Sequence, residues 1–374
     1  MRSRVRTFVG IVVLSLVLLL PETARAQIIP GECETGFLPS GAASLICVPA
    51  LGWNSQLVVF AHGFVPPGEG PSFELPILDG IPLPVLVQSL GFAFATTTYR
   101  DDGLVILEGV EDIRQLLTAF KAAHPALTRT HVFGVSEGGL VATLLAERSP
   151  ESVRSAVAAC APIGNFRLQV NYIGDFRVLF DYFFPGIIPG SAIHIPPPVI
   201  AQWESFYVPY IAEALQADPE RALELMRVSK AAFDPSNLAT VITTTINVLR
   251  YNILGANDAA QKLGGNPFGN RQTLYAGSSN DLRLNLLVHR FVASPLALQE
   301  MQLYETSGDL SVPLVTLHTT ADELVPFGHE LLYLPKVELS GRGQFVPLPV
   351  QRYGHCNFTT NELLGSFALA ISLP

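Results

Sequence analysis

Gly134-Val135-Ser136-Glu137-Gly138 is the stretch that decides the fold of this chain, and one more glycine, Gly139, follows it. It comes directly after the short apolar run 131–133 and opens a helix-like stretch at 139–146. A serine between two glycines at a sharp turn from a strand into a helix is held in a strained backbone conformation, so its neighbours must be small. Such a turn presents the hydroxyl at the sheet edge, above the positive end of the helix. Ser136 is therefore the candidate nucleophile.

The segments around this turn alternate between strand and helix patterns. Apolar β-type runs lie at 44–48, 57–61, 92–98, 131–133, 153–160, 314–319 and 345–350, and helical patterns lie at 85–90, 109–123, 139–146 and from about 360 onward. This alternation predicts an α/β fold with a mostly parallel central sheet and helices on both faces. The nearly continuous apolar character of the strands is typical of burial on both sides.

The middle of the chain has a different character. An aromatic stretch at 166–184 is followed by a proline-rich passage, and helical patterns lie at 218–233, 238–254 and 294–304. We interpret 27–163 as the first part of the core, 164–306 as an inserted and mainly helical cap, and 307–374 as the second part of the core. A separate domain without contact to the site is the alternative, and the return of core strands after 306 disfavours it.

Residues 1–26 have the three parts of a secretory signal peptide. Three arginines at 2, 4 and 6 precede the apolar run Phe8–Leu20, and Ala24-Arg25-Ala26 has the A-x-A pattern of a cleavage site. The run is shorter than the about 20 apolar residues that cross a bilayer. We expect cleavage after Ala26 and a secreted or periplasmic protein without stable membrane insertion. An uncleaved anchor is the alternative.

The charge of the chain limits its partners. The net charge is −9, and residues 1–26 hold four arginines and one glutamate, so the remainder is still more acidic. This argues against nucleic acid or acidic membranes as partners. No cluster of histidine, cysteine and aspartate has metal-ligand spacing, so we expect neither a metal nor an organic cofactor.

The four cysteines predict disulfides in an exported protein. Cys33 and Cys47 are close in sequence and suit a local bridge, which would leave Cys160 and Cys356 to pair across the fold. Three pairings are open in principle.

His62-Gly63-Phe64 directly follows the run 57–61. A strand that ends in His-Gly before a loop commonly builds half of an oxyanion hole, with the amide after the glycine as donor. The donors would be the backbone N–H groups of Phe64 and Glu137. The His62 side chain would then order the turn by hydrogen bonding.

The other two catalytic candidates follow later strands. Asp322 comes four residues after the run 314–318, where an acid at the carboxyl end of a buried strand can orient a histidine. A turn aspartate is the alternative, and Glu323 is the second candidate for the acid. His355 lies between the last strand and the terminal helix, and an imidazole can take the serine proton and return it to the leaving group. Serine, aspartate and histidine occur in the chain order of this architecture.

With these residues in this order, the chain resembles the α/β-hydrolase superfamily over about 40–165 and 307–374. The resemblance implies Ser136 as nucleophile, His355 as base, Asp322 as its orienting acid, and Phe64 and Glu137 as oxyanion donors. The serine excludes close similarity to the branches that use an aspartate nucleophile, such as dehalogenases and epoxide hydrolases.

Cys356, directly after His355, is similar to the His-Cys pair of tannase and feruloyl-esterase relatives. In that branch the partner cysteine precedes the serine, where this chain has Val135. A bridge from Cys160 to Cys356 would fix the histidine loop by a different route.

Together these residues predict an exported serine hydrolase that cleaves carboxylic esters, small or polymeric, through an acyl-enzyme intermediate. Five residues are candidates for lining an apolar substrate pocket, namely His62, Tyr99, Phe176, Phe180 and Trp203. The aromatic residues of the cap can equally form its own core.

Two other functions remain open. An exported peptidase or amidase of the same superfamily would need acidic groups for a peptide amine, and Glu204, Glu213 or Asp175 could serve. A non-catalytic binding module on the same scaffold is disfavoured, because such modules usually lose a triad member and all three are present here.

Overall fold

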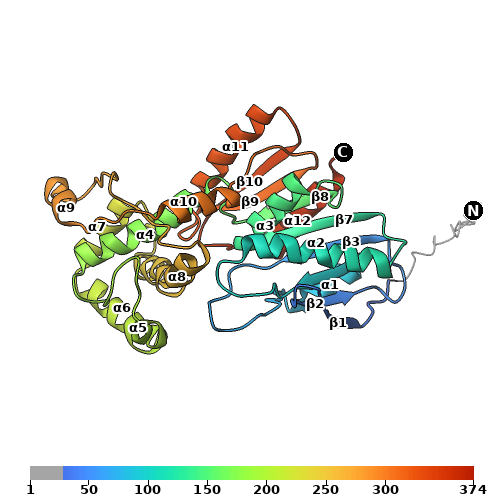
Figure 1. The fold of residues 1–374 in the computed structure, drawn as a ribbon, viewed down its shortest axis with the longest axis horizontal. Coiled ribbons are helices and arrows are strands. Elements are labelled where there is room, and N and C mark those ends of the chain that lie inside the picture. The colour runs from blue at the N-terminus through green and yellow to red at the C-terminus, as the bar shows by residue number, and fades with distance from the viewer. Residues whose placement is uncertain (1–27) are drawn as a thin grey trace, which may run out of the picture.

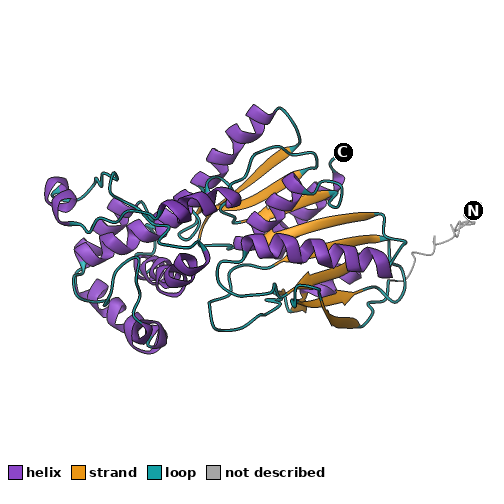
Figure 2. Ribbon diagram, in the orientation of Figure 1, coloured by secondary structure: helices purple, strands orange, loops and turns teal. Residues whose placement is uncertain are grey.

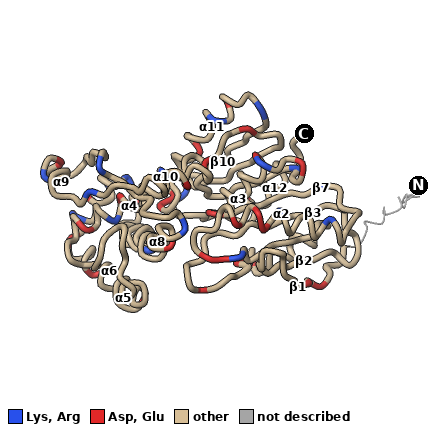
Figure 3. The backbone as a smooth tube through the Cα atoms, viewed as in Figure 1, with Lys and Arg blue, Asp and Glu red and all other residues tan. Residues whose placement is uncertain are grey.

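The computed structural model describes residues 28–374, which form a strand-rich half and a helical half lying side by side along the long axis (Figure 1). The predicted signal peptide and its cleavage point after Ala26 lie outside the described residues. Lysine and arginine residues are interspersed with acidic ones over both halves (Figure 3). No helix within 28–374 combines the length and the apolarity that a membrane crossing requires.

The strand-rich half is built on one eight-stranded sheet with the order β1-β2-β6-β3-β7-β8-β9-β10. Its strands are β1 (Cys33–Phe37), β2 (Ala43–Cys47), β3 (Gln56–Ala61), β6 (Ala93–Thr97), β7 (Arg129–Val135), β8 (Ser155–Ala159), β9 (Leu314–Ala321) and β10 (Phe345–Tyr353). The pairs β1–β2 and β2–β6 are antiparallel, and the strands from β6 to β10 in the sheet order all pair parallel with one another. The predicted mostly parallel sheet is confirmed, and β1 is an addition that the sequence pattern did not predict.

Helices cover both faces of this sheet (Figure 2). One face carries α2 (Ile106–Ala123), α3 (Glu137–Arg148) and α11 (Gly328–Ser340), and the other carries α1 (Leu83–Ser89), α12 (Thr360–Ser372) and the small hairpin of β4 (Ile77–Leu78) and β5 (Ile81–Pro82). Side chains alternate between the two faces along a strand. In β3, Leu57 and Val59 therefore pack towards α2 and α3, while Val58 and Phe60 pack towards α1 and α12.

The helical half lies between β8 and β9 in sequence, although these two strands are direct neighbours in the sheet. It contains α4 (Phe166–Phe183), α5 (Pro197–Ala201), the π-helical turn η1 (Trp203–Tyr207), α6 (Val208–Ala217), α7 (Pro219–Ser229), α8 (Thr240–Lys262), α9 (Asp281–Leu287), α10 (Pro295–Glu300) and the 3₁₀ turn η2 (Met301–Tyr304). We call residues 164–306 the cap. Its limits stay a prediction, since Phe166, Met301 and Tyr304 pack into the core of the strand-rich half.

Helix α4 shows why the cap folds on itself. The Asn165 side chain accepts a hydrogen bond from the Leu168 N–H at 2.8 Å and so caps the helix. The aromatic stretch that follows turns Phe176, Phe180 and Phe183 into the cap's own core. The sequence pattern assigned no element to this stretch, whereas the structure makes it an 18-residue helix.

Candidate active site

The candidate catalytic residues and their neighbours all follow the carboxyl ends of parallel strands. His62 follows β3, Ser136 follows β7, Cys160 follows β8, Asp322 follows β9, and His355 lies two residues beyond β10. Parallel strands end at one edge of the sheet, and this edge faces the cap in Figure 1. Residues from widely separated parts of the chain therefore meet there.

Ser136 lies in the turn between β7 and α3 with φ 56° and ψ −122°, a strained conformation for a non-glycine residue. The glycines around it are required by close backbone approach. A Cβ on Gly134 would lie 2.0 Å from the Gly138 carbonyl oxygen, and one on Gly138 would lie 2.1 Å from that of Ala61. The predicted strand–turn–helix around Ser136 is present.

A chain of hydrogen bonds joins Ser136 to His355 and Asp322. The Ser136 hydroxyl lies 2.9 Å from His355 Nε2. His355 Nδ1 lies 2.8 Å from Asp322 Oδ2 and 3.1 Å from Oδ1. Glu323, the second candidate for the acid, instead accepts a hydrogen bond from the Asn247 amide at 2.9 Å. The arrangement holds the imidazole so that Nε2 faces the hydroxyl.

Asp322 is fully buried but stays ionised. Burial opposes its charge, yet the neighbouring His355 and His318 rings outweigh that effect and hold the pKa of Asp322 well below its ordinary value. Asp322 Oδ1 also accepts hydrogen bonds from the backbone N–H groups of Leu324 and Val325, at 2.9 and 2.8 Å. The carboxylate is thus fixed in place by its own loop.

His318 is a neighbour of the site whose importance the sequence pattern did not reveal. Its Nε2 donates to the Val325 carbonyl at 2.9 Å and lies 3.5 Å from Asp322 Oδ2, while Nδ1 lies 3.1 Å from Glu330 Oε1. Burial opposes a charge on the ring, but the hydrogen bonds with Asp322 and Glu330 raise the pKa of His318 to about 10. A buried cation therefore lies between two buried carboxylates behind the candidate triad. Glu330 lies twelve residues further on, in α11, and nothing in this sequence separation predicts that it contacts His318.

The predicted oxyanion loop lies against the nucleophile. A Cβ on Gly63 would lie 3.3 Å from Ser136 Cβ, so the loop approaches as closely as a glycine allows. His62 Nδ1 lies 2.8 Å from the Gly63 carbonyl oxygen, and its ring stacks on Tyr99 with centroids 4.0 Å apart. His62 and Tyr99 therefore support the loop from beneath.

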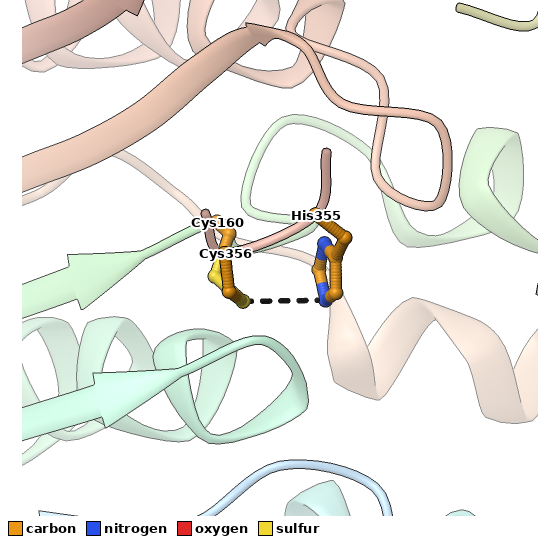
Figure 4. Close-up of side chains that lie close together, drawn as sticks. All are labelled: Cys160, His355 and Cys356. Carbon is orange, nitrogen blue, oxygen red and sulfur yellow. Dashed lines mark hydrogen bonds between the residues drawn. A yellow bond between two sulfur atoms is a disulfide. The ribbon is translucent and has the colours of Figure 1, made fainter. Parts of the chain in front are cut away.

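A disulfide ties the histidine loop to the sheet. Cys160 at the end of β8 is bonded to Cys356, and the Cys356 sulfur lies 3.3 Å from His355 Nε2 (Figure 4). Both sulfurs are used in this bond, so they are not thiolates that could bind a metal together with His355. The second disulfide joins Cys33 and Cys47, which face each other in the β1–β2 pair. Of the three pairings that were open, this is the one the structure contains.

An apolar cavity of about 160 Å³ lies beside Ser136, beneath the cap. Its walls include Ser136, Glu137 and Phe64, together with cap side chains such as Tyr251 and Phe268. Glu137 is its one carboxyl among the described residues. Burial raises the pKa of Glu137 to about 8, although the hydrogen bond that its Oε1 accepts from the Val105 N–H opposes this increase. The carboxyl is therefore largely protonated at neutral pH.

The candidate pocket residues need correction, because none of the five lines this cavity. Phe176, Phe180 and Trp203 lie in the core of the cap, and His62 and Tyr99 lie under the oxyanion loop. The reason is geometric, since α4 presents one face to the cap core and another, with Ile173 and Gly174, to the cavity. Without an assigned helix at 166–183, the sequence could not separate these faces.

The acidic candidates for binding a peptide amine also lie away from the cavity walls. Glu204 pairs with Arg250 at 3.2 Å, and Glu213 is exposed on α6. Asp175 accepts a hydrogen bond from the Tyr275 hydroxyl at 2.6 Å, inside the cap.

Comparisons with known proteins agree with this architecture. The family described as serine aminopeptidase, S33, matches residues 107–334, which is more than half of the chain. The matched stretch includes Ser136 and Asp322. No curated protein matches the sequence.

Similar solved structures include peptidases and esterases. An acylaminoacyl peptidase from Pyrococcus horikoshii has 11% identity and a TM-score of 0.44, with 90% of this chain and 39% of that chain covered. Feruloyl esterase B from Aspergillus oryzae has 13% identity and a TM-score of 0.46, with 87% and 73% covered. An esterase from Pyrococcus furiosus has 11% identity and a TM-score of 0.43, with 92% and 91% covered. The chain thus spans about two fifths of the length of the acylaminoacyl peptidase.

The family match extends over the strand–turn–helix at Ser136, the cap and the loop that carries Asp322. The observed sheet order and the helices on both of its faces agree with it. The chain therefore belongs to the serine aminopeptidase S33 family and is a serine hydrolase of the α/β-hydrolase fold.

Proposed function

We propose that this protein is an exported carboxylic ester hydrolase that works through an acyl-enzyme intermediate. The observation that carries the proposal is the unbroken chain from the Ser136 hydroxyl through His355 to Asp322, with contacts of 2.9 and 2.8 Å, at the wall of an apolar cavity. Nucleophile, base and orienting acid in this geometry suit acyl transfer.

In the proposed mechanism, His355 Nε2 takes the proton of Ser136 as its oxygen attacks the ester carbonyl. The backbone N–H groups of Phe64 and Glu137 stabilise the oxyanion. His355 then gives the proton to the leaving alcohol, and the acyl group remains on Ser136. Asp322 stabilises the imidazolium, whose Nε2–H can also donate weakly to the nearby Cys356 sulfur. A water molecule activated by His355 releases the acid.

An ester suits the cavity better than a peptide with a free amine. A cationic amine needs an ionised carboxylate at hydrogen-bond distance. The carboxyl that lines the cavity is Glu137, which burial keeps protonated at neutral pH. The three other acidic candidates lie away from the cavity. This observation supports an uncharged apolar acyl group.

Export is part of the proposal, and the two disulfides support it. Such bonds persist in oxidising compartments and are rare in the cytosol. Sequencing the N-terminus of the protein recovered from the producing cells would test the predicted cleavage after Ala26. A chain that keeps residues 1–26 would contradict that prediction.

The activity is tested with p-nitrophenyl esters from C2 to C16. We expect hydrolysis by the wild type and a loss of at least about 10³-fold in kcat for Ser136→Ala, because removing a triad member leaves only oxyanion stabilisation and binding. Ser152→Ala, in the turn after α3, is the matched control and should retain wild-type activity. Hydrolysis of aminoacyl anilides without any ester hydrolysis would contradict the ester proposal in favour of a peptidase.

A further inference from the structure

A second apolar cavity, of about 360 Å³, lies on the opposite face of the sheet from α2 and α3. It lies between α1, α12, the β4–β5 segment and the sheet itself, and it is larger than the cavity beneath the cap. Its lining is mainly aliphatic and aromatic and includes Phe60, Leu86, Phe92, Phe133, Leu364 and Phe367. Glu74, which is exposed, is the one charged residue of this lining in the described chain.

Three residues of this lining adjoin the candidate triad. Gly63 is so close to the nucleophile that a Cβ on it would lie 3.3 Å from Ser136 Cβ and 3.8 Å from Ser136 Oγ. Val135 directly precedes Ser136 in the chain. Cys356 follows His355, and its sulfur lies 3.3 Å from His355 Nε2. The second cavity therefore ends beside the candidate triad, at the residues next to Ser136 and His355 in the chain, although neither Ser136 nor His355 lines it.

The cavity beneath the cap reaches the same groups from another side. Its walls contain Phe64 and Glu137, whose N–H groups are the proposed oxyanion donors. In acyl transfer, the acyl carbonyl must lie at these donors, while the leaving oxygen must lie within reach of the histidine that protonates it. The two sides of an ester bond thus require different positions around Ser136.

We propose that the second cavity binds the alcohol part of the substrate, and that the substrate is an ester in which both the acyl and the alcohol part are apolar. This inference rests on the proposed ester hydrolysis. The acyl part occupies the cavity beneath the cap, and the alcohol part extends past Cys356 into the cavity between α1 and α12. A sugar or another polyhydroxy alcohol is excluded as the preferred group, because its hydroxyls would be buried against a lining that offers them almost no partners.

The experiment varies the two parts of the ester separately. Proton release is followed with alkyl butanoates from methyl to octyl, and with methyl esters from C4 to C12. For the wild type, kcat/KM should rise with the length of the alcohol, by up to about fourfold for each added methylene. In Leu364→Trp, the indole fills the second cavity, so the ratio of octyl to methyl ester should fall at least about tenfold.

Three further variants make the test specific. Leu86→Trp fills the same cavity from α1 and should repeat the effect if Leu364→Trp fails to fold. Ile173→Trp fills the cavity beneath the cap and should change the dependence on acyl length rather than on alcohol length. Leu339→Trp, at an 88% exposed position on α11, is the control and should match the wild type in both series.

The outcomes separate the two proposals. A wild type that hydrolyses esters, while both tryptophan variants of the second cavity keep its dependence on alcohol length, overturns the assignment and leaves ester hydrolysis standing. If those variants instead change the dependence on acyl length, the second cavity binds the acyl part, and the assignment to the alcohol part is also overturned. A wild type without activity on any ester contradicts the proposed function and, with it, this inference.

Discussion

At the scale of single residues, the pair of His355 and Asp322 carries the most specific expectation. Asp322 Oδ2 lies 2.8 Å from His355 Nδ1, and this contact decides which ring nitrogen faces Ser136. Asp322→Asn keeps the shape but can stabilise the wrong tautomer, so we expect kcat to fall by about 10⁴-fold. Glu323→Gln, which changes the adjacent acid that contacts Asn247, is the matched control and should keep kcat within a few-fold. Equal losses in the two variants would contradict the role of Asp322.

Glu137 predicts a dependence of stability on pH. Its pKa is about 8 in the folded chain and 4.5 ordinarily, so between these values the unfolded chain has lost a proton that the folded chain keeps. The free energy of unfolding then falls with rising pH, by up to about 1.4 kcal/mol for each pH unit. The glutamine of Glu137→Gln does not ionise, so this variant has no such dependence on pH. The variant should therefore gain stability relative to wild type from about pH 5 to 8, with no further gain above.

Denaturant unfolding of both proteins at pH 5, 6.5, 8 and 9 measures this difference. Wild-type and variant curves that run parallel across this range would show that Glu137 ionises with its ordinary pKa. The backbone N–H that is the proposed oxyanion donor is the same in both proteins, so esterase activity serves as a check that the turn is intact.

At the scale of elements, the turn from β7 into α3 tolerates no side chain at Gly138. An added Cβ would lie 2.1 Å from the Ala61 carbonyl oxygen and 2.3 Å from the His62 carbonyl oxygen. Both are backbone atoms, so relieving the clash would require the backbone to move. Gly138→Ala should therefore lower the melting temperature and reduce activity by more than about 100-fold.

Gly365 in the middle of α12 is the matched control. It has open space where a Cβ would lie. Gly365→Ala should raise the free energy of unfolding by about 0.5–1 kcal/mol, since alanine favours the helix. Thermal unfolding and ester hydrolysis of both variants check these opposite effects. Wild-type activity in Gly138→Ala would contradict the close packing of the turn.

At the scale of the whole molecule, the cap and the sheet share their cores. Leu324, which follows the acid loop, joins the cap core, while Leu263 and Ala297 of the cap join the core around α2 and α3. The candidate site lies where the two halves pack together. Its geometry therefore depends on contacts between residues that are far apart in sequence.

The two disulfides should differ in what they control. Cys160–Cys356 closes a separation of 196 residues and holds the loop of His355, whereas Cys33–Cys47 closes 14 residues at the other edge of the sheet. Replacing either pair by serines should destabilise the protein by about 2–5 kcal/mol. Only the Cys160/Cys356 pair should also lower kcat at temperatures where the protein remains folded. An equal effect of both pairs on kcat would contradict a positioning role for the bond.

Much of the architecture could be predicted from the sequence because it depends on local patterns. The glycines around Ser136, the apolar runs of the strands and the helical spacing in 109–123 are set by sterics and by burial within short segments. That Ser136, Asp322 and His355 lie at the same end of the sheet then follows from the parallel strands that precede them. The aromatic helix at 166–183 was missed, because its middle, 170–176, consists of a glycine and residues of low intrinsic helix propensity, and tertiary packing outweighs that preference.

The sequence by itself determined the nucleophile turn, the mostly parallel sheet and the residues that belong at its carboxyl edge, because neighbouring residues decide backbone conformation and burial. Only the tertiary structure decided which cysteines pair, that Asp322 rather than Glu323 contacts His355, and that His318 pairs with Glu330. It also decided that Phe176, Phe180 and Trp203 fill the cap core while Phe64, Tyr251 and Phe268 face the cavity. These outcomes depend on how separate elements pack against each other, and the spacing of residues along the sequence does not predict which of them come into contact.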